Sequence, residues 1–497
     1  MNTTELKTII IGFIAMFLFP AAELMAELGN SRPNIIFILT DDQGYGDLEC
    51  HGHPFLKTQN LDKLYEQSTR FTDFHASPTC APTRSALMSG KAPFRCGITH
   101  TILERERMAL GIRTVAEVLK ASGYHTGIFG KWHLGDEAPY QPENRGFEEV
   151  FIHGGGGIGQ NFPVTCADVP GNTYFDPIIK HNGVFEQTKG FCTDVFFKQA
   201  LGWIKSCKDQ QEPFFAFIPS NAPHGPFIAP EKYKALYRED CHGDEKVAAF
   251  YGMIHNIDDN VGILMNKMEE WGLNENTLLI FMTDNGSVMG YKQYNAGMRG
   301  GKGSLNEGGA RVPLFMRWNG KITPGKDVGI LTRHYDLFPT LAEFAGAEIP
   351  EDLDGRSLIP LLEQQDESSS EFGPARLTFF HQGRWNKAGA PGKWGEGNTD
   401  PDMAEFERFA VRSEKLRLVG LDSLYDIAND PGENVNVIKS HQQEADSMLV
   451  AYEAWWDEVR PFMVNEDAPL DREQPFVVEF ERQKKTIGVP LWKEPDL

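Results

Sequence analysis

Two apolar runs in the chain each end in a pair of oxygen-bearing side chains. One run leads into Asp41 and Asp42, and a second leads into Asp284 and Asn285. Three carboxylates and an amide oxygen are hard ligands of the kind that bind Ca²⁺ or Mg²⁺. Aspartate and asparagine also form turns and helix caps after strands, and either pair alone would favour that interpretation. The duplicated pattern favours a metal site, although its spacing is not that of an EF-hand.

A second candidate is Cys80, which opens a segment that reads Cys-Ala-Pro-Thr-Arg-Ser-Ala-Leu-Met-Ser-Gly. A plain thiol is a poor partner for hard oxygen ligands. Arg84 follows four residues later, so a helix that starts near Pro82 would place its guanidinium one turn from residue 80, where it can hold an anion. The alternative is a buried structural cysteine followed by a surface arginine.

Other candidates for proton transfer and charge follow predicted strands or lie among glycines. Lys131 can neutralise an anion and His133 can move a proton near neutral pH, and both follow a predicted strand over residues 127–130. His224 follows another apolar run and suits a general acid. Lys302 lies among glycines, which let backbone N–H groups approach an anion. Each residue alone is more often structural or on the surface. The catalytic interpretation therefore depends on whether these residues lie together in the fold.

These side chains need a scaffold that brings strand ends together. Continuous apolar runs predict strands buried on both faces, as in a parallel sheet, over residues 34–39, 214–218 and 278–282. Helical patterns lie between them over residues 194–207 and 245–270, and a capping box of Thr114 and Glu117 begins another helix. The alternation indicates an α/β fold, in which ligands bind beyond the carboxyl ends of the strands.

The pattern changes after residues 363–373, a polar segment without periodicity that we interpret as a linker. Short predicted strands follow over residues 377–381, 409–411 and 416–419. We therefore expect a catalytic domain over residues 27–365 and a smaller α+β domain over residues 374–497, with an antiparallel sheet.

Residues 1–26 resemble a targeting segment, with Lys7 before an apolar run over residues 9–19 and small residues up to Ala26. We expect a cleaved signal peptide and export to the periplasm or the medium. The alternative is an uncleaved lipid or membrane anchor. No later segment is apolar enough to span a membrane, so no stable membrane insertion is expected.

The net charge of −22, without a basic stripe, argues against a nucleic-acid partner. An anionic substrate must then be held by local cations or a metal. The seven cysteines leave at least one free or modified, and their pairing stays open.

The motifs together resemble the type I sulfatases of the alkaline-phosphatase-like superfamily, from about Asn34 to residue 437. The segment from Cys80 to Gly90 resembles the first sulfatase signature, and residues 123–133 resemble the second. Ser89 stands where many members have threonine. The resemblance implies a large, mostly parallel sheet sandwiched by helices.

The resemblance also implies a ligand set and a mechanism. A maturation enzyme would convert Cys80 to formylglycine. One Ca²⁺ ion would be bound by formylglycine 80 and four further residues: Asp41, Asp42, Asp284 and Asn285. The catalytic pocket would be completed by five residues, Arg84, Lys131, His133, His224 and Lys302, of which Lys131, His224 and Lys302 would also bind substrate.

In that family the hydrated aldehyde attacks sulfur and gives a sulfated-enzyme intermediate. His224, with Lys302, protonates the departing alcohol, and His133 takes the proton of the second hydroxyl as sulfate leaves. A serine nucleophile would lack that second hydroxyl, which gives the modification a physical reason.

The substrate is expected to be a sulfated small molecule or glycan. Residues 381–398 carry cationic and aromatic side chains among glycines, including His381 and Arg384. We expect this loop to overhang the site and select a carbohydrate sulfate, and the alternative is a surface insertion. Two rival functions stay open. They are a phosphomonoester or phosphonate hydrolase of the same superfamily, and an exported glycan-binding protein with a decayed site.

Overall fold

The computed structural model describes residues 28–101, 107–162, 165–363, 372, 376–383, 404–465, 467–468 and 473–497. The predicted signal peptide lies outside these residues, as does most of the predicted linker. In the described part of the chain, no helix is both long and apolar enough to cross a membrane.

The strands are β1 Asn34–Thr40, β2 Thr69–Phe71, β3 Phe74–His75, β4 His125–Lys131, β5 Glu149–His153, β6 Ile178–His181, β7 Val184–Gln187, β8 Phe214–Pro219, β9 Thr277–Thr283, β10 Leu314–Arg317, β11 Asp327–Val328, β12 Thr332–Arg333, β13 Thr378–His381, β14 Phe409–Arg412, β15 Leu416–Val419 and β16 Ser423–Asp426. The α-helices are α2 Gln59–Glu66, α3 Cys80–Ser89, α4 Val115–Ala121, α5 Cys192–Gln210, α6 Glu231–Lys234, α7 Glu245–Glu270, α8 Glu307–Ala310, α9 Leu337–Phe344, α10 Ile359–Glu363, α11 Gln442–Val459 and α12 Pro475–Thr486.

A large mixed sheet forms the centre of the molecule. Within the described residues it has ten strands in the order β11-β2-β10-β9-β1-β8-β4-β5-β6-β7. The central strands from β9 to β5 are parallel, and β10 and β6 add antiparallel strands on either side. The predicted α/β fold is confirmed, with antiparallel edges that the apolar runs did not indicate.

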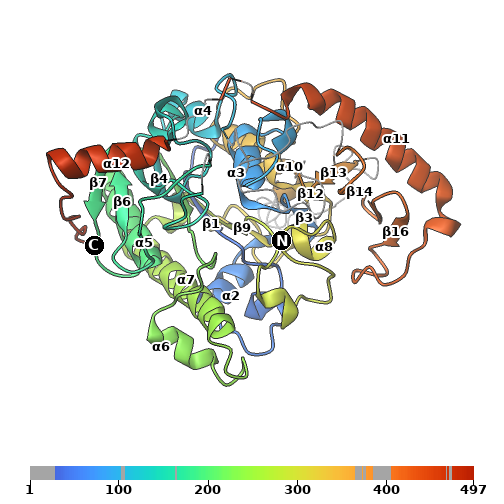
Figure 1. Cartoon of the computed structure of the whole chain (residues 1–497), viewed down its shortest axis with the longest axis horizontal. Helices are drawn as coiled ribbons and strands as arrows, with labels where there is room; N and C mark the ends of the chain where they lie inside the picture. Colours follow the sequence, from blue (N-terminus) through green and yellow to red (C-terminus); the bar gives the residue numbers. More distant parts are fainter. Residues whose placement is uncertain are drawn as a thin grey trace, which may run out of the picture.

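Both faces of the sheet are buried, which explains why its central strands are apolar throughout. In β1, Ile36 and Ile38 join the core formed with α2, α5 and α7, whereas Phe37 and Leu39 join the core formed with α3, α4 and α9. Figure 1 shows α5 and α7 together along one side of the molecule and α3 and α4 on the other. The sheet is therefore sandwiched by helices, as expected.

The helices follow the predicted pattern with two differences. Helix α7 has the predicted bounds, and α4 begins with the predicted capping box, in which Glu117 N donates to Thr114 Oγ1 at 3.0 Å. Helix α5 extends beyond the predicted residues 194–207 at both ends. Helix α3 begins at Cys80, two residues before Pro82, after Thr79 in an extended conformation.

The predicted antiparallel sheet is confirmed as β13-β14-β15-β16, and α11 packs on it through Tyr452 and Trp456. The last helix, α12, does not stay with this unit. Phe480 contacts Phe185 of β7, with ring centroids 5.4 Å apart, and Figure 1 shows α12 beside β6 and β7 at the opposite end from α11. The tail of the predicted C-terminal domain thus covers the edge of the large sheet.

Candidate active site

The register of the central strands brings the candidate residues to one edge of the large sheet. Thr40 is the Cα partner of Thr283, so the residues that follow β1 and β9 emerge side by side. Strand β4 ends at Lys131, beyond β8 on the other flank of β1. The residues after β1 and β9, which the sequence indicates as metal-ligand candidates, therefore lie next to one another.

Asp41 and Lys131 form a buried ion pair at this edge. Lys131 Nζ donates to Asp41 Oδ2 at 2.7 Å, and neither side chain is exposed. Arg84 Nη2 lies 3.9 Å from the same oxygen. Although burial opposes ionisation, Lys131 and these neighbouring cations hold the pKa of Asp41 below its ordinary value. Asp41 is therefore a carboxylate at neutral pH.

Asp42 faces the open side of the site. Its backbone is left-handed, with φ of 69°, which is uncommon for a residue with a side chain and turns the chain sharply after β1. Lys302 Nζ lies 2.6 Å from Asp42 Oδ1, and His224 Nε2 lies 3.7 Å from Asp42 Oδ2. The side chains of Lys302 and His224 are 20% and 13% exposed, so they border the entrance.

Asp284 and Asn285 complete the oxygen-rich group. Asp42 N donates to Asp284 Oδ1 at 2.9 Å, and Arg84 Nη2 donates to Asp284 Oδ2 at 3.3 Å. Asn285 Nδ2 donates to Asp42 Oδ1 at 3.0 Å, so the amide oxygen of Asn285 points away from this carboxylate oxygen. Burial and the nearby Asp41 raise the pKa of Asp284 well above its ordinary value.

Cys80 lies at the first position of α3, beside these carboxylates. Ligand atoms of Cys80, Asp41 and Asp284 all lie within 4.8 Å of one another. Burial raises the pKa of the Cys80 thiol, so the unmodified side chain is neutral at pH 7 and a poor ligand for a hard cation. The pocket thus has the oxygen ligands for a metal but an unsuitable unmodified side chain at position 80.

His133 contacts Cys80 and has a defined tautomer. Its Nδ1 lies 3.8 Å from Cys80 Sγ, and its Nε2 lies 3.0 Å from the carbonyl oxygen of Thr101. A carbonyl only accepts hydrogen bonds, so Nε2 carries the proton of the neutral ring and Nδ1 faces residue 80 as an acceptor. Burial, aided by Lys131, lowers the pKa of His133 well below its ordinary value, which keeps the ring neutral.

The buried oxygens give a direct test of whether a cation fits. Among the described residues, Asp41 Oδ1 and Asn285 Oδ1 are buried and have no hydrogen-bond partner. Buried oxygen atoms without partners are costly and rare in folded proteins. They belong to the same ligand set as Asp42 and Asp284, so the residues present fit a hard cation such as Ca²⁺.

A glycine run that the sequence analysis did not include also shapes the site. A Cβ atom on Gly156 would lie 3.2 Å from His133 Cε1, and a Cβ on Gly157 would lie 3.0 Å from His224 Nδ1. Side chains at these positions would therefore crowd both imidazoles. The four consecutive glycines were the available signal, but they do not indicate by themselves what they approach.

His381 packs against Phe94 and Trp456, with ring centroids 5.6 Å and 5.1 Å away. Its ring is buried and tilted by 46° relative to Trp456. Nε2 contacts the carbonyl oxygen of Ala404 at 3.0 Å, and Nδ1 accepts from Gly383 N. The geometry describes a packing role and gives no support to a substrate contact. Arg384, the other predicted substrate contact of this loop, lies outside the described residues.

None of the seven cysteines, which all lie in the described part of the chain, forms a disulfide bond there. Six are buried and Cys50 is half-buried. The possible pairing left open by the sequence is therefore not used in this structure.

The family comparison agrees with this geometry. The family model described as Sulfatase matches residues 33–347. This range holds each metal-ligand candidate, Cys80 and the cations around it. The chain belongs to the sulfatase family.

The alignments with two curated relatives cover most of the sulfatase chain. It is 34% identical to Arylsulfatase A of Homo sapiens over 457 residues, which cover 84% of this chain and 85% of that protein. It is 28% identical to N-acetylgalactosamine-6-sulfatase of Canis lupus familiaris over 88% of this chain and 82% of that protein.

A solved structure shows the same fold. The crystal structure of Ps i-CgsB in complex with k-i-k-neocarrahexaose has a TM-score of 0.75 and 25% identity, and the match covers 92% of this chain and 98% of that one. The sulfatase is accordingly a sulfuric ester hydrolase with an alkaline-phosphatase-like fold, as the sequence predicted.

Proposed function

We propose that this sulfatase releases sulfate from sulfated carbohydrates with a formylglycine at position 80 and one Ca²⁺ ion. The observation that carries the proposal is the convergence of Cys80, Asp41 and Asp284 within 4.8 Å, surrounded by buried cations. A thiol serves poorly there, whereas an oxidised, oxygen-bearing side chain would match the other ligands.

Five residues would hold the ion, namely residue 80, Asp41, Asp42, Asp284 and Asn285. When bound, Ca²⁺ would supply positive charge for an oxygen nucleophile and for the sulfate oxygens. The formylglycine would supply that nucleophile as a hydrated aldehyde. Lys131, Arg84 and Lys302 add fixed positive charge, which would bind the sulfate group despite the net charge of −22.

Two histidines divide the proton transfers. Nδ1 of His133 faces residue 80 and would accept a proton there. His224 lies at the entrance, where the departing alcohol would sit. Its Nδ1 lies 2.7 Å from the carbonyl oxygen of Gly225 and so donates to it, which leaves Nε2 directed toward the site near Asp42. For Nε2 to protonate the alcohol, with Lys302 beside it, His224 must be an imidazolium, because Nδ1 keeps its own proton for Gly225. Burial lowers the pKa of His224, whereas the Asp42 carboxylate near Nε2 opposes that shift.

The carbohydrate part of the proposal is supported by the names of similar proteins. One relative is an N-acetylgalactosamine-6-sulfatase, and the similar solved structure holds k-i-k-neocarrahexaose. The sulfatase has no arrangement in its described residues that identifies one sugar. A sulfated sugar is nevertheless the substrate class that best matches these relatives and the cation-rich pocket.

Export and maturation belong to the same proposal. The apolar run over residues 9–19, followed by small residues, supports a signal peptide and a location in the periplasm or medium. A formylglycine-generating enzyme would be the maturation partner that oxidises Cys80.

The test combines mass spectrometry with kinetics. In protein from its native host, the peptide that contains Cys80 should be about 18 Da lighter than the thiol form. The same protein should release sulfate from an aryl sulfate and from sulfated mono- or oligosaccharides. The Cys80→Ser variant should lose this activity, whereas Cys50→Ser, a change at a half-buried cysteine outside the site, should retain it.

The outcomes separate the parts of the proposal. An unmodified thiol in an active enzyme would exclude formylglycine. A rate on aryl phosphate above that on aryl sulfate would favour the phosphomonoester alternative. Activity on aryl sulfate without release from any sulfated sugar would exclude the carbohydrate substrate class.

A further inference from the structure

Lys302 lies in a segment, residues 299–307, that links the active site to the small sheet. On the active-site side, Lys302 N donates to Ser287 O at 2.9 Å, and Gly303 N donates to Pro78 O at 2.8 Å, close to Cys80. Gly300 and Gly303 have positive φ of 83° and 79°, so the segment turns sharply on both sides of Lys302. Such a segment depends on fixed ends to hold its side chains in place.

Both ends of the segment meet at Glu433, which follows β16. At the far end, Asn306 Nδ2 donates to Glu433 Oε1 at 3.1 Å and Glu307 N donates to Oε2 at 2.9 Å. At the near end, Arg299 Nη1 donates to the carbonyl oxygen of Glu433 at 3.4 Å and to Tyr425 Oη at 3.2 Å. One residue of the C-terminal unit therefore contacts both ends of the segment.

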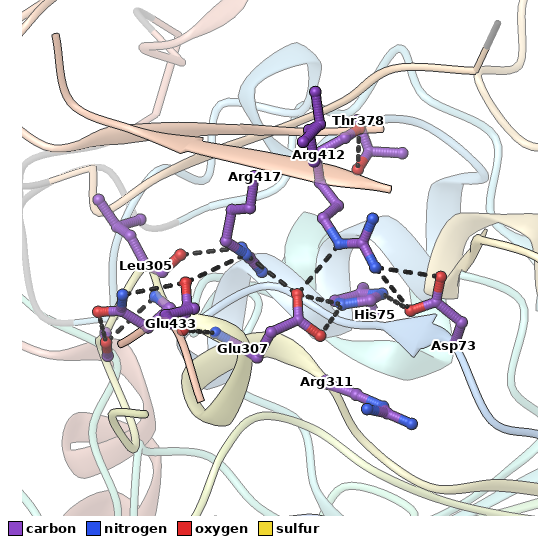
Figure 2. Close-up of polar contacts among 12 residues, drawn as sticks. Asp73, His75, Leu305, Glu307, Arg311, Thr378, Arg412, Arg417 and Glu433 are labelled. Carbon is purple, nitrogen blue, oxygen red and sulfur yellow. Dashed lines mark hydrogen bonds and ion pairs between the residues drawn. The ribbon is translucent and has the colours of Figure 1, made fainter. Parts of the chain in front are cut away.

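The charge of Glu433 is balanced in a buried network, which Figure 2 shows around Glu307. Arg417 Nε lies 3.0 Å from Glu307 Oε1 and 3.8 Å from Glu433 Oε1, and none of the three side chains is exposed. Arg417 Nη1 also donates to Leu305 O at 2.8 Å. Removing one member of such a network leaves the others without their partner in a low-dielectric interior.

The same network argues against a second metal site at Asp73, His75 and Glu307. Their ligand atoms lie within 4.8 Å of one another. Arg412, however, donates to Glu307 Oε1 at 3.1 Å and to Asp73 at 3.3 Å, as Figure 2 shows. The arginines already neutralise these carboxylates, so the cluster functions as an ion-pair network.

We propose that Glu433 is a positioning residue for catalysis, which holds Lys302 at the active site by fixing both ends of residues 299–307. The inference rests on the role of Lys302 in the proposed function. It assigns the small sheet a part in the chemistry, although no residue of that sheet contacts the reacting atoms in the described structure. Without the two hydrogen bonds to the carboxylate, the backbone bonds of Lys302 N and Gly303 N remain, but the position of Lys302 Nζ beside Asp42 would be less closely fixed.

A double-mutant cycle tests the proposal. The variants are Glu433→Gln, Lys302→Ala and the two combined, with Glu453→Gln on the exposed face of α11 as the matched control. Glutamine can accept from only one of the two donors, so Glu433→Gln should lower kcat/KM on an aryl sulfate about 10- to 100-fold. In the Lys302→Ala background the same change should cost less than about twofold, because its effect acts through Lys302.

Hydrogen exchange supplies a readout that does not depend on turnover. The amide of Glu307 should exchange faster in Glu433→Gln, while the amides of β1 keep their protection. If Glu433→Gln does not fold, Asn306→Ala removes one donor to the carboxylate and should show the same non-additive pattern with a smaller loss.

Equal losses in the wild-type and Lys302→Ala backgrounds, or unchanged exchange at Glu307, would overturn the proposal. An inactive wild type, or a fully active Lys302→Ala, would contradict the proposed function instead. In that case the exchange of Glu307 still decides whether Glu433 holds the segment.

Discussion

Nδ1 of His133 lies 3.8 Å from Sγ of Cys80, while Nε2 of the same ring is committed to the carbonyl oxygen of Thr101. This pair joins the end of β4 to the beginning of α3. It places the accepting nitrogen of a neutral imidazole against the residue that we propose as the nucleophile. A proton released at residue 80 would therefore meet an unprotonated ring nitrogen of His133.

Replacing His133 tests that relationship. His133→Asn should lower kcat by about 100-fold or more, because general base catalysis of this kind contributes at least that factor. Turnover of an aryl sulfate at saturating concentration measures the effect. His125→Asn, on the exposed beginning of the same strand, should keep its rate. A His133→Asn enzyme within threefold of wild type would rule out this role.

Removal of calcium should reduce both activity and thermal stability. The ion would bind the folded state alone, so about 100 Kd of free Ca²⁺ should add about 2.7 kcal/mol to the free energy of unfolding. A chelator should lower the Tm and Ca²⁺ should restore it. Asp284→Asn keeps the shape of the side chain and should weaken the response, whereas Asp327→Asn on the exposed edge strand should not. A Tm that does not change when the chelator is added would contradict the proposed calcium site.

His224 should matter most for substrates with poor leaving groups. As the proton donor to the departing alcohol, it contributes little to the rate when the leaving group is already acidic. His224→Ala should therefore lose more kcat/KM on alkyl or sugar sulfates than on nitrophenyl sulfate, and a series of aryl sulfates measures the trend. His441→Ala, which is partly exposed before α11, is the control. Equal losses across the series would exclude the assignment.

Asp258 should make the stability depend on pH between about 4 and 6. This residue of α7 accepts hydrogen bonds from the N–H groups of Asn60 and Leu61 at the beginning of α2, and burial raises its pKa to about 6. The folded state therefore keeps a proton that the unfolded chain, with a pKa near 3.8, has lost. The contribution of Asp258 to stability falls as pH rises through this window, by on the order of 3 kcal/mol, and is constant above it.

Urea unfolding of wild type and Asp258→Asn at several pH values isolates this contribution. The difference in the free energy of unfolding between the two proteins should change between pH 4 and pH 6.5 in favour of the variant. Asp446→Asn, at an exposed carboxylate of α11, should follow wild type throughout. A difference that is constant with pH would show that Asp258 is not the titrating group.

The packing of α12 on the large sheet predicts a stability effect far from the active site. Phe480 is buried against Phe185, so Phe480→Ala should lower the free energy of unfolding by about 3–5 kcal/mol. Urea unfolding should show one transition, because α12 belongs to the main core. Val478→Ala, on the exposed side of the same helix, should cost much less. A change below 1 kcal/mol in Phe480→Ala would contradict this packing.

Local patterns were sufficient to predict the central strands and the grouping of the candidate ligands at their ends. The apolar runs around β1, β8 and β9 need burial on both faces, and Asp41 and Asp284 follow such runs directly. The capping box of Thr114 likewise depends on residues three apart. These features are encoded within a few residues of one another, so they are visible in one sequence.

The remaining features depend on contacts between distant segments. The pairing of Glu433 with Glu307 N joins residues 126 apart in the chain, and no local pattern indicates it. His381 has neighbours typical of a sugar site in sequence, yet in the fold its ring is buried and in contact with Trp456. The return of α12 to β7 is equally a product of tertiary packing, since its apolar positions would suit either sheet.

The alignment of Thr40 with Thr283 ties the chemistry to the assembly of the sheet. If β1 and β9 paired one residue out of register, the side chains of one strand would point to the opposite face of the sheet. The four candidate oxygen ligands would then no longer lie together. A mispaired molecule would then be inert, with no partial site capable of stray hydrolysis. The number of ions bound per chain in a purified sample would accordingly measure the fraction of correctly folded molecules.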